Sequence, residues 1–123
     1  MRIAILSNGN INYSTLRLKE EAEKRGHYVK VVKYKNCYVS IDENNPKVIY
    51  RGKELGEFDV VIPRIASYMT RYGTSVVRQL EMANPNTFFV NRSIAISRSR
   101  DKLRSVQLLA RAGVAIPKTV FSR

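Results

Sequence analysis

The chain has 123 residues, of which 44% are hydrophobic and 26% charged, with six Gly and four Pro. This length and composition are typical of one globular domain, here residues 1–123, and exclude a disordered or fibrous protein. The formal net charge is +12 and is uneven, because residues 1–62 hold 11 basic and 8 acidic side chains whereas residues 63–123 hold 11 and 2.

The N-terminal quarter of the chain has the pattern of a β-α-β unit. Residues 2–7 are mostly aliphatic and predict a buried strand that ends in a turn at Asn8-Gly9-Asn10. The helix that follows has Ser14 as its expected N-cap and Gly26 just past its C-terminus. Residues 28–32 are rich in valine and predict a second strand, parallel to the first.

Residues 36–57 change character and predict a small β-hairpin excursion with a tight turn at Arg51-Gly52-Lys53. Residues 58–64 return to a buried strand, whose carboxyl end is marked by Pro63. The next helix has Ser67 as its expected cap and ends at residues 84–86. Its apolar stripe, spaced by three and four residues, consists of Met69, Tyr72, Val76, Leu80 and Ala83.

The C-terminal part continues the alternation of strands and helices. Residues 87–91 predict another apolar strand, and a turn or short helix is expected over residues 92–97. The last helix is expected to start near Ser99-Arg100 and to stop at Gly113, with Val120-Phe121 beginning one more strand. Strands and helices that alternate in this way predict an α/β fold, a doubly wound parallel sheet covered on both faces.

Ligands of such sheets bind at the carboxyl ends of the strands, where this sequence places Ser7-Asn8-Gly9, Arg64 and Asn91-Arg92. Arg64 could bind a carboxylate or phosphate through its guanidinium group, or form an ion pair with Asp59 or Glu57. Asn91 could orient a ligand or serve as a turn residue.

The sequence gives little support for a dinucleotide-binding turn, a catalytic histidine or a cysteine-based metal site. The first loop has one of the three glycines of a dinucleotide-binding turn, Gly9, so a plain turn is favoured. His27 is the single histidine and follows a helix-ending glycine, which favours a structural role. Cys37 has no histidine near it in sequence, and we predict a buried thiol and no metal site.

The basic second half would attract phosphates, nucleic acid or carboxylate-rich peptides, or would simply be a solvated surface. Nucleic acid is the secondary option, because no aromatic side chain that could stack on bases lies between the basic residues of the cluster. These are Arg92, Arg98, Arg100, Lys102, Arg104 and Arg111.

One cysteine excludes an internal disulfide, and the apolar run at the N-terminus is too short for a signal peptide or a membrane span. We therefore expect a cytoplasmic protein with no membrane partner.

The chain resembles the RimK-type ribosomal-protein glutamate ligases, members of the ATP-grasp superfamily, over essentially its whole length. The resemblance begins with residues 1–7, 13–18, 25–27, 58–65 and 72–73 and is completed by Asn91, residues 94–95, Arg100-Asp101-Lys102-Leu103-Arg104, residues 107–110 and residues 113–117. The closing Asp-Lys pair, leucine-bearing helix and Gly-x-x-x-Pro are shared more widely by ATP-grasp ligases.

This resemblance implies a pre-ATP-grasp, Rossmann-like N-terminal domain of an enzyme that uses ATP and Mg²⁺ or Mn²⁺ to activate a carboxylate as an acyl phosphate. The amino group of glutamate then attacks, and the C-terminal tail of a ribosomal protein is extended. It also implies that Lys102 reaches the ATP phosphates and that Arg64, Asn91 and Ser7 face the substrate cleft.

The resemblance implies further that the ATP-grasp catalytic domain is absent from these residues. We therefore expect no catalytic or metal-binding residue, no tightly bound cofactor and no activity from the chain alone, and we expect a homo-oligomer. The alternative is a stand-alone basic module that binds ribosomal RNA or an acidic peptide tail, or that forms oligomers. Such a module would bind RNA or poly-glutamate tightly, whereas a piece of a ligase should bind neither tightly.

Overall fold

A computed structural model describes residues 1–8 and 12–122 of the chain. The predicted turn residues Gly9 and Asn10 lie outside the described residues. In chain order the elements are β1 (Arg2–Ser7), α1 (Tyr13–Lys24), β2 (Tyr28–Lys33), the 3-10 helix η1 (Tyr34–Asn36), β3 (Cys37–Ser40), β4 (Lys47–Tyr50), β5 (Lys53–Glu54), β6 (Val60–Pro63), the 3-10 helix η2 (Ser67–Met69), α2 (Thr70–Ala83), β7 (Phe88–Phe89), α3 (Ser93–Arg100) and α4 (Lys102–Arg111).

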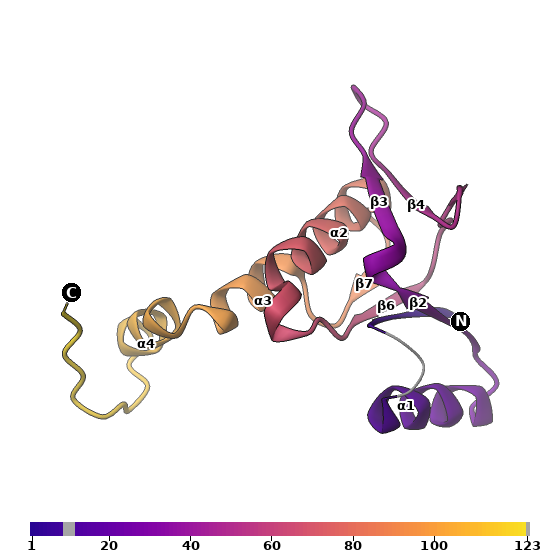
Figure 1. Cartoon of the computed structure of the whole chain (residues 1–123). Helices are drawn as coiled ribbons and strands as arrows, with labels where there is room; N and C mark the ends of the chain where they lie inside the picture. Colours follow the sequence, from indigo (N-terminus) through magenta and orange to yellow (C-terminus); the bar gives the residue numbers. More distant parts are fainter. Residues whose placement is uncertain (9–11, 123) are drawn as a thin grey trace.

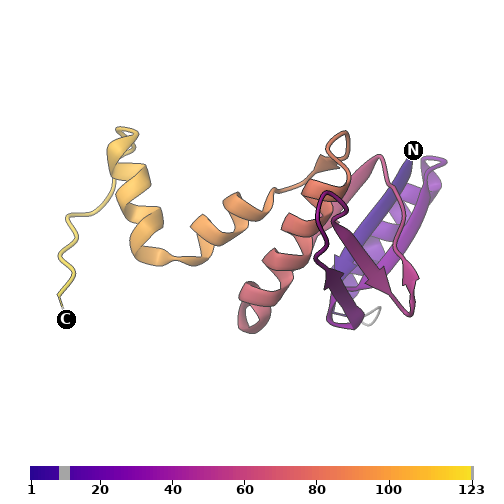
Figure 2. The same cartoon turned by 90° about the horizontal axis from the view of Figure 1, so that it is seen from above.

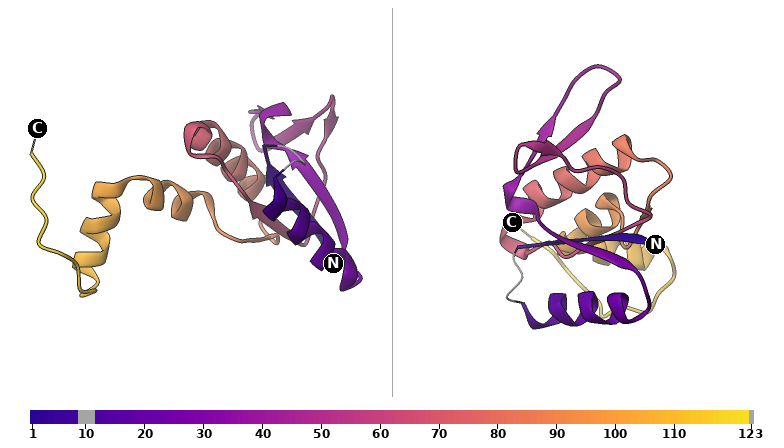
Figure 3. Two further views of the ribbon diagram at one scale, coloured as in Figure 1. Left: turned by 60° about the horizontal axis from the view of Figure 1, so that its bottom comes forward. Right: turned by 90° about the vertical axis from the view of Figure 1, so that its right-hand side faces the viewer.

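The predicted parallel sheet is confirmed, with strand order β2-β1-β6-β7. Helix α1 covers one face of this sheet, and α2 covers the other (Figure 3). The alternation of side chains along β1 explains the two layers, since neighbouring residues of a strand point to opposite faces. Ile3 and Ile5 belong to the smaller core cluster, with Ala22 of α1 packed against it, whereas Ala4 and Leu6 belong to the larger one beneath α2.

The predicted hairpin excursion is also confirmed, as a separate antiparallel sheet of order β3-β4-β5. Its tight turn places Arg51 and Gly52 at positive φ values of 52° and 78°. The sheet is held to α2 by two side chains of that helix. Tyr72 donates its hydroxyl hydrogen to the carbonyl of Cys37, and Gln79 Nε2 donates to the carbonyl of Ser40 at 2.8 Å.

Two predicted helix caps are wrong. Helix α1 is capped by Asn12, whose Oδ1 accepts from the backbone N–H of Ser14 at 3.0 Å, so Ser14 lies inside the helix. Asn is as good a cap as Ser, and the pattern does not distinguish them. Ser67 begins the short turn η2, and α2 starts at Thr70 without a side-chain cap. The glycine at the end of α1 is confirmed, since Gly26 has a φ of 75°.

The C-terminal third differs most from the expectation. Strand β7 is two residues long. The short helix expected over residues 92–97 is present as α3, which runs to Arg100. Helix α4 starts at Lys102, with Asp101 as its cap. No strand is assigned at Val120 and Phe121, which are 85% and 72% exposed. A strand needs a neighbour to pair with, and the described residues offer none at this position.

Helices α3 and α4 extend away from the sheet (Figures 1 and 2). Both ends of α3 are tied to the rest of the molecule. At its start the carboxylate of Glu81 accepts from the backbone N–H and the hydroxyl of Ser93, at 2.8 and 2.6 Å. At its end the guanidinium group of Arg100 donates to the carbonyl of Ile65 at 2.9 Å. None of the residues of α4 is buried.

Within residues 1–8 and 12–122, every helix is too short or too polar to cross a lipid bilayer.

Helix α2 approaches the loop after β6 so closely that only glycine fits at position 73. A Cβ atom added at Gly73 would lie 2.4 Å from Cγ2 of Ile65, which is itself only 6% exposed. Ile65 follows Arg64 and carries the carbonyl that binds Arg100, so this contact also sets the position of two cationic side chains.

We predict that Gly73→Ala lowers the free energy of unfolding by about 1–2 kcal/mol, because the clash outweighs the better helix propensity of alanine. Urea denaturation measures the change. In an Ile65→Ala background the same substitution should cost nothing or stabilise the chain, since the clashing side chain is gone. An equal loss in both backgrounds would contradict the steric explanation.

Candidate functional site

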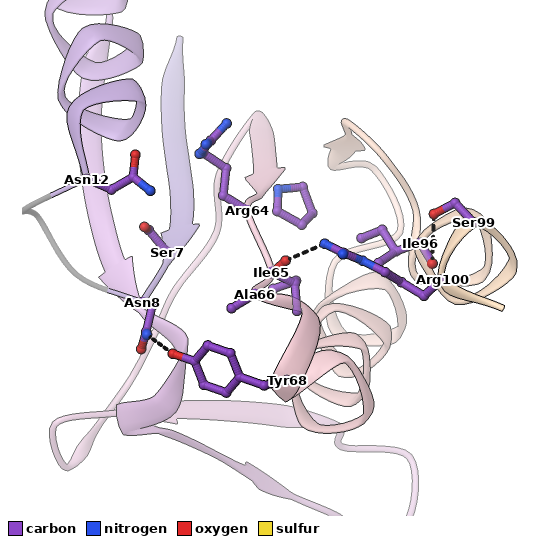
Figure 4. Close-up of a pocket in the computed structure, with 11 residues that line it drawn as sticks. Ser7, Asn8, Asn12, Arg64, Ile65, Ala66, Tyr68, Ile96, Ser99 and Arg100 are labelled. Carbon is purple, nitrogen blue, oxygen red and sulfur yellow. Dashed lines mark hydrogen bonds between the residues drawn. The ribbon is translucent and has the colours of Figure 1, made fainter. Parts of the chain in front are cut away.

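A cleft of about 890 Å³ opens at the carboxyl ends of β1 and β6 (Figure 4). Three parts of the chain line it: the end of β1 with the start of α1, the segment that follows β6, and the last turns of α3. The lining residues are Ser7, Asn8, Asn12, Pro63, Arg64, Ile65, Ala66, Tyr68, Ile96, Ser99 and Arg100.

The parallel pairing of β1 and β6 fixes Arg64 at the edge of this cleft. Pro63 is paired with Leu6 and has no N–H group, and the backbone N–H of Arg64 donates to the carbonyl of Leu6 at 2.7 Å. The strand pairing therefore continues one residue past β6, and the side chain of Arg64 begins where the sheet ends.

The guanidinium group of Arg64 is only partly satisfied by the protein. It donates from one terminal nitrogen to Ser14 Oγ at 2.6 Å, and Ser14 Oγ donates to Asn12 Oδ1 at 2.6 Å. The Nε atom of Arg64 is buried and has no hydrogen-bond partner among the described residues. The protein shields this Nε atom, so an oxyanion in the cleft would meet the terminal nitrogens of the guanidinium group.

Asn8 lies on the same side of the cleft as Ser7. Its Nδ2 atom donates to the hydroxyl of Tyr68, and its Oδ1 atom is buried with no partner among the described residues. The hydroxyl of Ser7 lies 3.1 Å from that of Thr15, which links β1 to α1. The cleft thus combines a cation, an amide and hydroxyl groups, a set suited to a carboxylate-bearing ligand.

The opposite wall of the cleft is built by α3. In Figure 4 the side chain of Arg100 extends from α3 toward Ile65, whose carbonyl it binds. That bond uses one of the five N–H donors of a guanidinium group. Arg64 and Arg100 thus bring two cations to one cleft from opposite sides.

The structure brings two of the four predicted site residues together. Ser7 and Arg64 line the cleft. Asn91, which follows a cis peptide bond, is exposed and is not among the residues that line it. Lys102 is exposed and lines a second hollow on the other side of Arg100.

This second hollow has a volume of about 940 Å³, lies between α2 and the junction of α3 with α4, and is called the basic groove below. Its lining residues are Ser67, Thr70, Arg71, Thr74, Ser75, Arg78, Ser97, Ser99, Arg100, Asp101 and Lys102.

Sequence reasoning missed Asn12, Tyr68 and Arg100 as cleft residues. The cap of α1 could have been found at Asn12, because Asn and Ser are comparable at that position. No local signal marks Arg100, since it reaches the cleft only because α3 packs beside the segment after β6. The suggested ion pairs of Arg64 with Asp59 or Glu57 do not occur among the described residues.

Comparison with known families matches residues 1–96 to the family described as the RimK PreATP-grasp domain. Among curated proteins, a "Probable alpha-L-glutamate ligase" of Vibrio vulnificus (strain YJ016) is 57% identical over 122 residues, which are 99% of this chain and 40% of that protein. The protein of the same name from Teredinibacter turnerae is 59% identical over 122 residues, with the same coverage. The chain thus spans about two fifths of the length of these relatives.

Solved structures with the same fold are more distant in sequence. A RimK domain ATP-grasp protein from Sphaerobacter thermophilus superposes with a TM-score of 0.69 at 19% identity and covers 96% of this chain and 40% of its own. The macrocyclase MdnB from Microcystis aeruginosa gives a TM-score of 0.70 at 14% identity and covers 100% of this chain and 54% of its own. These likenesses support the α/β fold.

Two further side chains with reactive groups lie outside the cleft and the basic groove. His27 stands between α1 and β2, where its backbone N–H donates to the carbonyl of Ala22 at 3.1 Å. Cys37 is a buried thiol, as predicted, and burial raises its pKa to about 11. Burial, and secondarily the neighbouring Cys37, also raises the pKa of Tyr72. The described residues contain no group of three or more His, Cys, Asp or Glu side chains that could hold a metal ion.

We predict that the stability of the chain falls between about pH 9 and pH 11, partly because of Cys37. The thiol keeps its proton in the folded state up to about pH 11, whereas in the unfolded chain it loses the proton near pH 8.5, so raising the pH favours unfolding. Urea denaturation across this pH range should show a smaller loss for Cys37→Ala than for the parent chain. Equal losses would contradict the assignment.

Proposed function

The chain belongs to the RimK PreATP-grasp domain family, and from this premise we propose that it is the N-terminal domain of an ATP-dependent carboxylate–amine ligase that adds glutamate to the C-terminal tail of a ribosomal protein. We place the whole enzyme in the cytoplasm, as a homo-oligomer that requires ATP and Mg²⁺ or Mn²⁺. The 57% identity over 122 residues to a protein named as a glutamate ligase carries this proposal.

The role of this domain in the proposed reaction follows from its cleft. Arg64 lines the cleft, and its guanidinium group would bind a carboxylate of the acceptor tail or of the incoming glutamate. Arg100 on the opposite wall raises the positive potential of the same space. Ser7 and Asn8 would orient the ligand through their polar groups. That Asn91 faces the substrate cleft remains a proposal, and it rests on the family resemblance alone.

Among the described residues, only Lys102 is proposed to contact the nucleotide. Lys102 is exposed at the first position of α4 and forms no ion pair among the described residues, so its ammonium group is free to reach a phosphate. ATP with its metal ion would activate the acceptor carboxylate as an acyl phosphate. In the proposed enzyme, the metal ligands belong to the ATP-grasp catalytic domain that the family resemblance implies.

We predict that this chain can replace the matching 122 residues of the Vibrio vulnificus relative without loss of its proposed glutamate ligase activity. In that chimaera Arg64→Gln should lower kcat/KM for the acceptor peptide by about tenfold or more, since hydrogen bonds to charged groups contribute about 1.5–3 kcal/mol. The KM for ATP should stay unchanged in Arg64→Gln and should rise in Lys102→Ala.

The matched control is Lys53→Gln, which removes one positive charge from the exposed strand β5. Glutamate-dependent ADP release and the mass of the acceptor peptide measure the reaction. If the relative adds glutamate to the peptide and the chimaera does not, the ligase proposal for this chain fails and the stand-alone binding module gains support. If Lys53→Gln reduces kcat/KM as much as Arg64→Gln, the assignment of Arg64 is wrong.

We further predict that the 123 residues alone fold but neither hydrolyse ATP nor ligate glutamate. Circular dichroism and phosphate release would be measured on the purified chain beside a Lys102→Ala control. ATP hydrolysis above that of the control would overturn this prediction.

A further inference from the structure

The basic groove gathers cations from two elements that are far apart in the sequence. Arg71 and Arg78 come from α2, and Arg100 and Lys102 come from the junction of α3 and α4. The only acidic residue that lines the groove is Asp101, and its carboxylate caps α4 by accepting from the backbone N–H of Arg104 at 3.0 Å. The groove therefore has a strong excess of positive charge.

These cations are not neutralised by the protein. Among residues 1–8 and 12–122, the ion pairs join Arg17, Lys19, Lys24 and Lys47 to glutamates, and none includes a cation of the basic groove. Arg100 is held by the carbonyl of Ile65 and keeps further donors for a ligand. Four like charges close together repel one another, and an anionic partner would relieve that repulsion.

The spacing of the arginines favours an extended partner over a compact one. Arg71 and Arg78 are two helical turns apart, so they lie on the same side of α2 and about 10.5 Å apart along its axis. In an extended peptide, side chains two and four residues apart lie on the same face, at about 7 and 13 Å, so carboxylates along one face bracket this spacing and the long arginine side chains could reach them. A single phosphate or carboxylate group matches this arrangement less well.

The chemistry of the lining distinguishes a peptide from a nucleic acid. The groove is lined by Arg, Lys, Ser, Thr and Asp, and no aromatic residue lines it. Proteins that bind single-stranded nucleic acid add stacking side chains to their positive charges, and this groove offers none. Hydroxyl and guanidinium groups suit carboxylates instead.

The groove adjoins the cleft that holds Arg64. Ser99 and Arg100 line both hollows, so these two residues form a common wall between the two spaces. A peptide lying in the groove could pass Arg100 and place its end in the cleft.

We propose that the basic groove is a docking site for an acidic peptide, held in an extended form by Arg71, Arg78 and Arg100. The identity of this peptide rests on the proposed function: it is the glutamate-rich part of the acceptor tail, whose reacting end then lies in the cleft beside Arg64. Arg71 and Arg78 thus provide a second contact, separate from Arg64 in the cleft and from Lys102, which is proposed to bind the nucleotide.

The test is a titration of the ¹⁵N-labelled chain with acetylated tetraglutamate, followed by the backbone amide shifts. Shifts should appear at residues 67–78 and 97–102 and should weaken as salt screens the charges. Arg71→Gln/Arg78→Gln should raise the dissociation constant about fivefold or more, since two exposed charge contacts contribute about 1 kcal/mol together. The control Arg104→Gln/Arg111→Gln removes the same charge from exposed positions of α4 outside both hollows. It should change the dissociation constant less than about twofold.

Several results would overturn the proposal: no shifts, shifts outside the groove and cleft, or equal weakening by the control variant. Tighter binding of tetrauridylate would assign the groove to nucleic acid, and displacement of the peptide by equimolar inorganic phosphate would assign it to compact anions. Peptide binding without ligation by the chimaera would reject only the proposed ligase function. Ligation without peptide binding to the groove would reject only the docking site.

Discussion

The burial of β1 on both faces is the constraint on which the rest of the structure depends. β1 lies between β2 and β6, and its successive side chains enter two different core clusters. Both neighbours run parallel to β1, so the carboxyl ends of β1 and β6 meet at one edge. That edge carries Ser7 and Arg64, and α3 closes its open side through Arg100. The cleft is therefore a consequence of how the core is built.

The fold could be predicted where periodicity decides it. The strand at residues 2–7, the parallel sheet and the hairpin excursion follow from apolar runs and turn residues that act over a few positions. The helix caps were less predictable, because Asn12 and Ser14 are equivalent by chemistry and only the path of the chain selects between them. The start of α3 is held by Glu81 from a different helix, and no local pattern contains that contact.

The residues of the candidate site also divide into those that the sequence could predict and those that it could not. Ser7 and Arg64 could be placed because strand direction alone brings strand ends together. Asn91 was expected by the same rule, but β7 ends at Phe89, and the chain turns away before it reaches the cleft. Lys102 follows the junction of α3 and α4. Whether its side chain reaches the cleft or the basic groove therefore depends on the angle between the two helices. Such angles arise from tertiary packing, which a pattern of residue types does not encode.

Asp101 is the single residue between α3 and α4. It ends the first helix and caps the second. This extended residue, together with the hydrogen bond from Ser105 Oγ to the carbonyl of Arg98 at 2.7 Å, sets the direction of α4. Helix α4 is about 15 Å long, so a rotation of about 20° at Asp101 would carry its far end through about 5 Å. Arg100 and Lys102 stand on either side of this pivot, on the common wall of the two hollows and at the end of the groove. Because Lys102 is the first residue of α4 and lies next to this pivot, a swing of α4 would displace the far end of the helix much more than the groove, which would keep its shape together with the cleft.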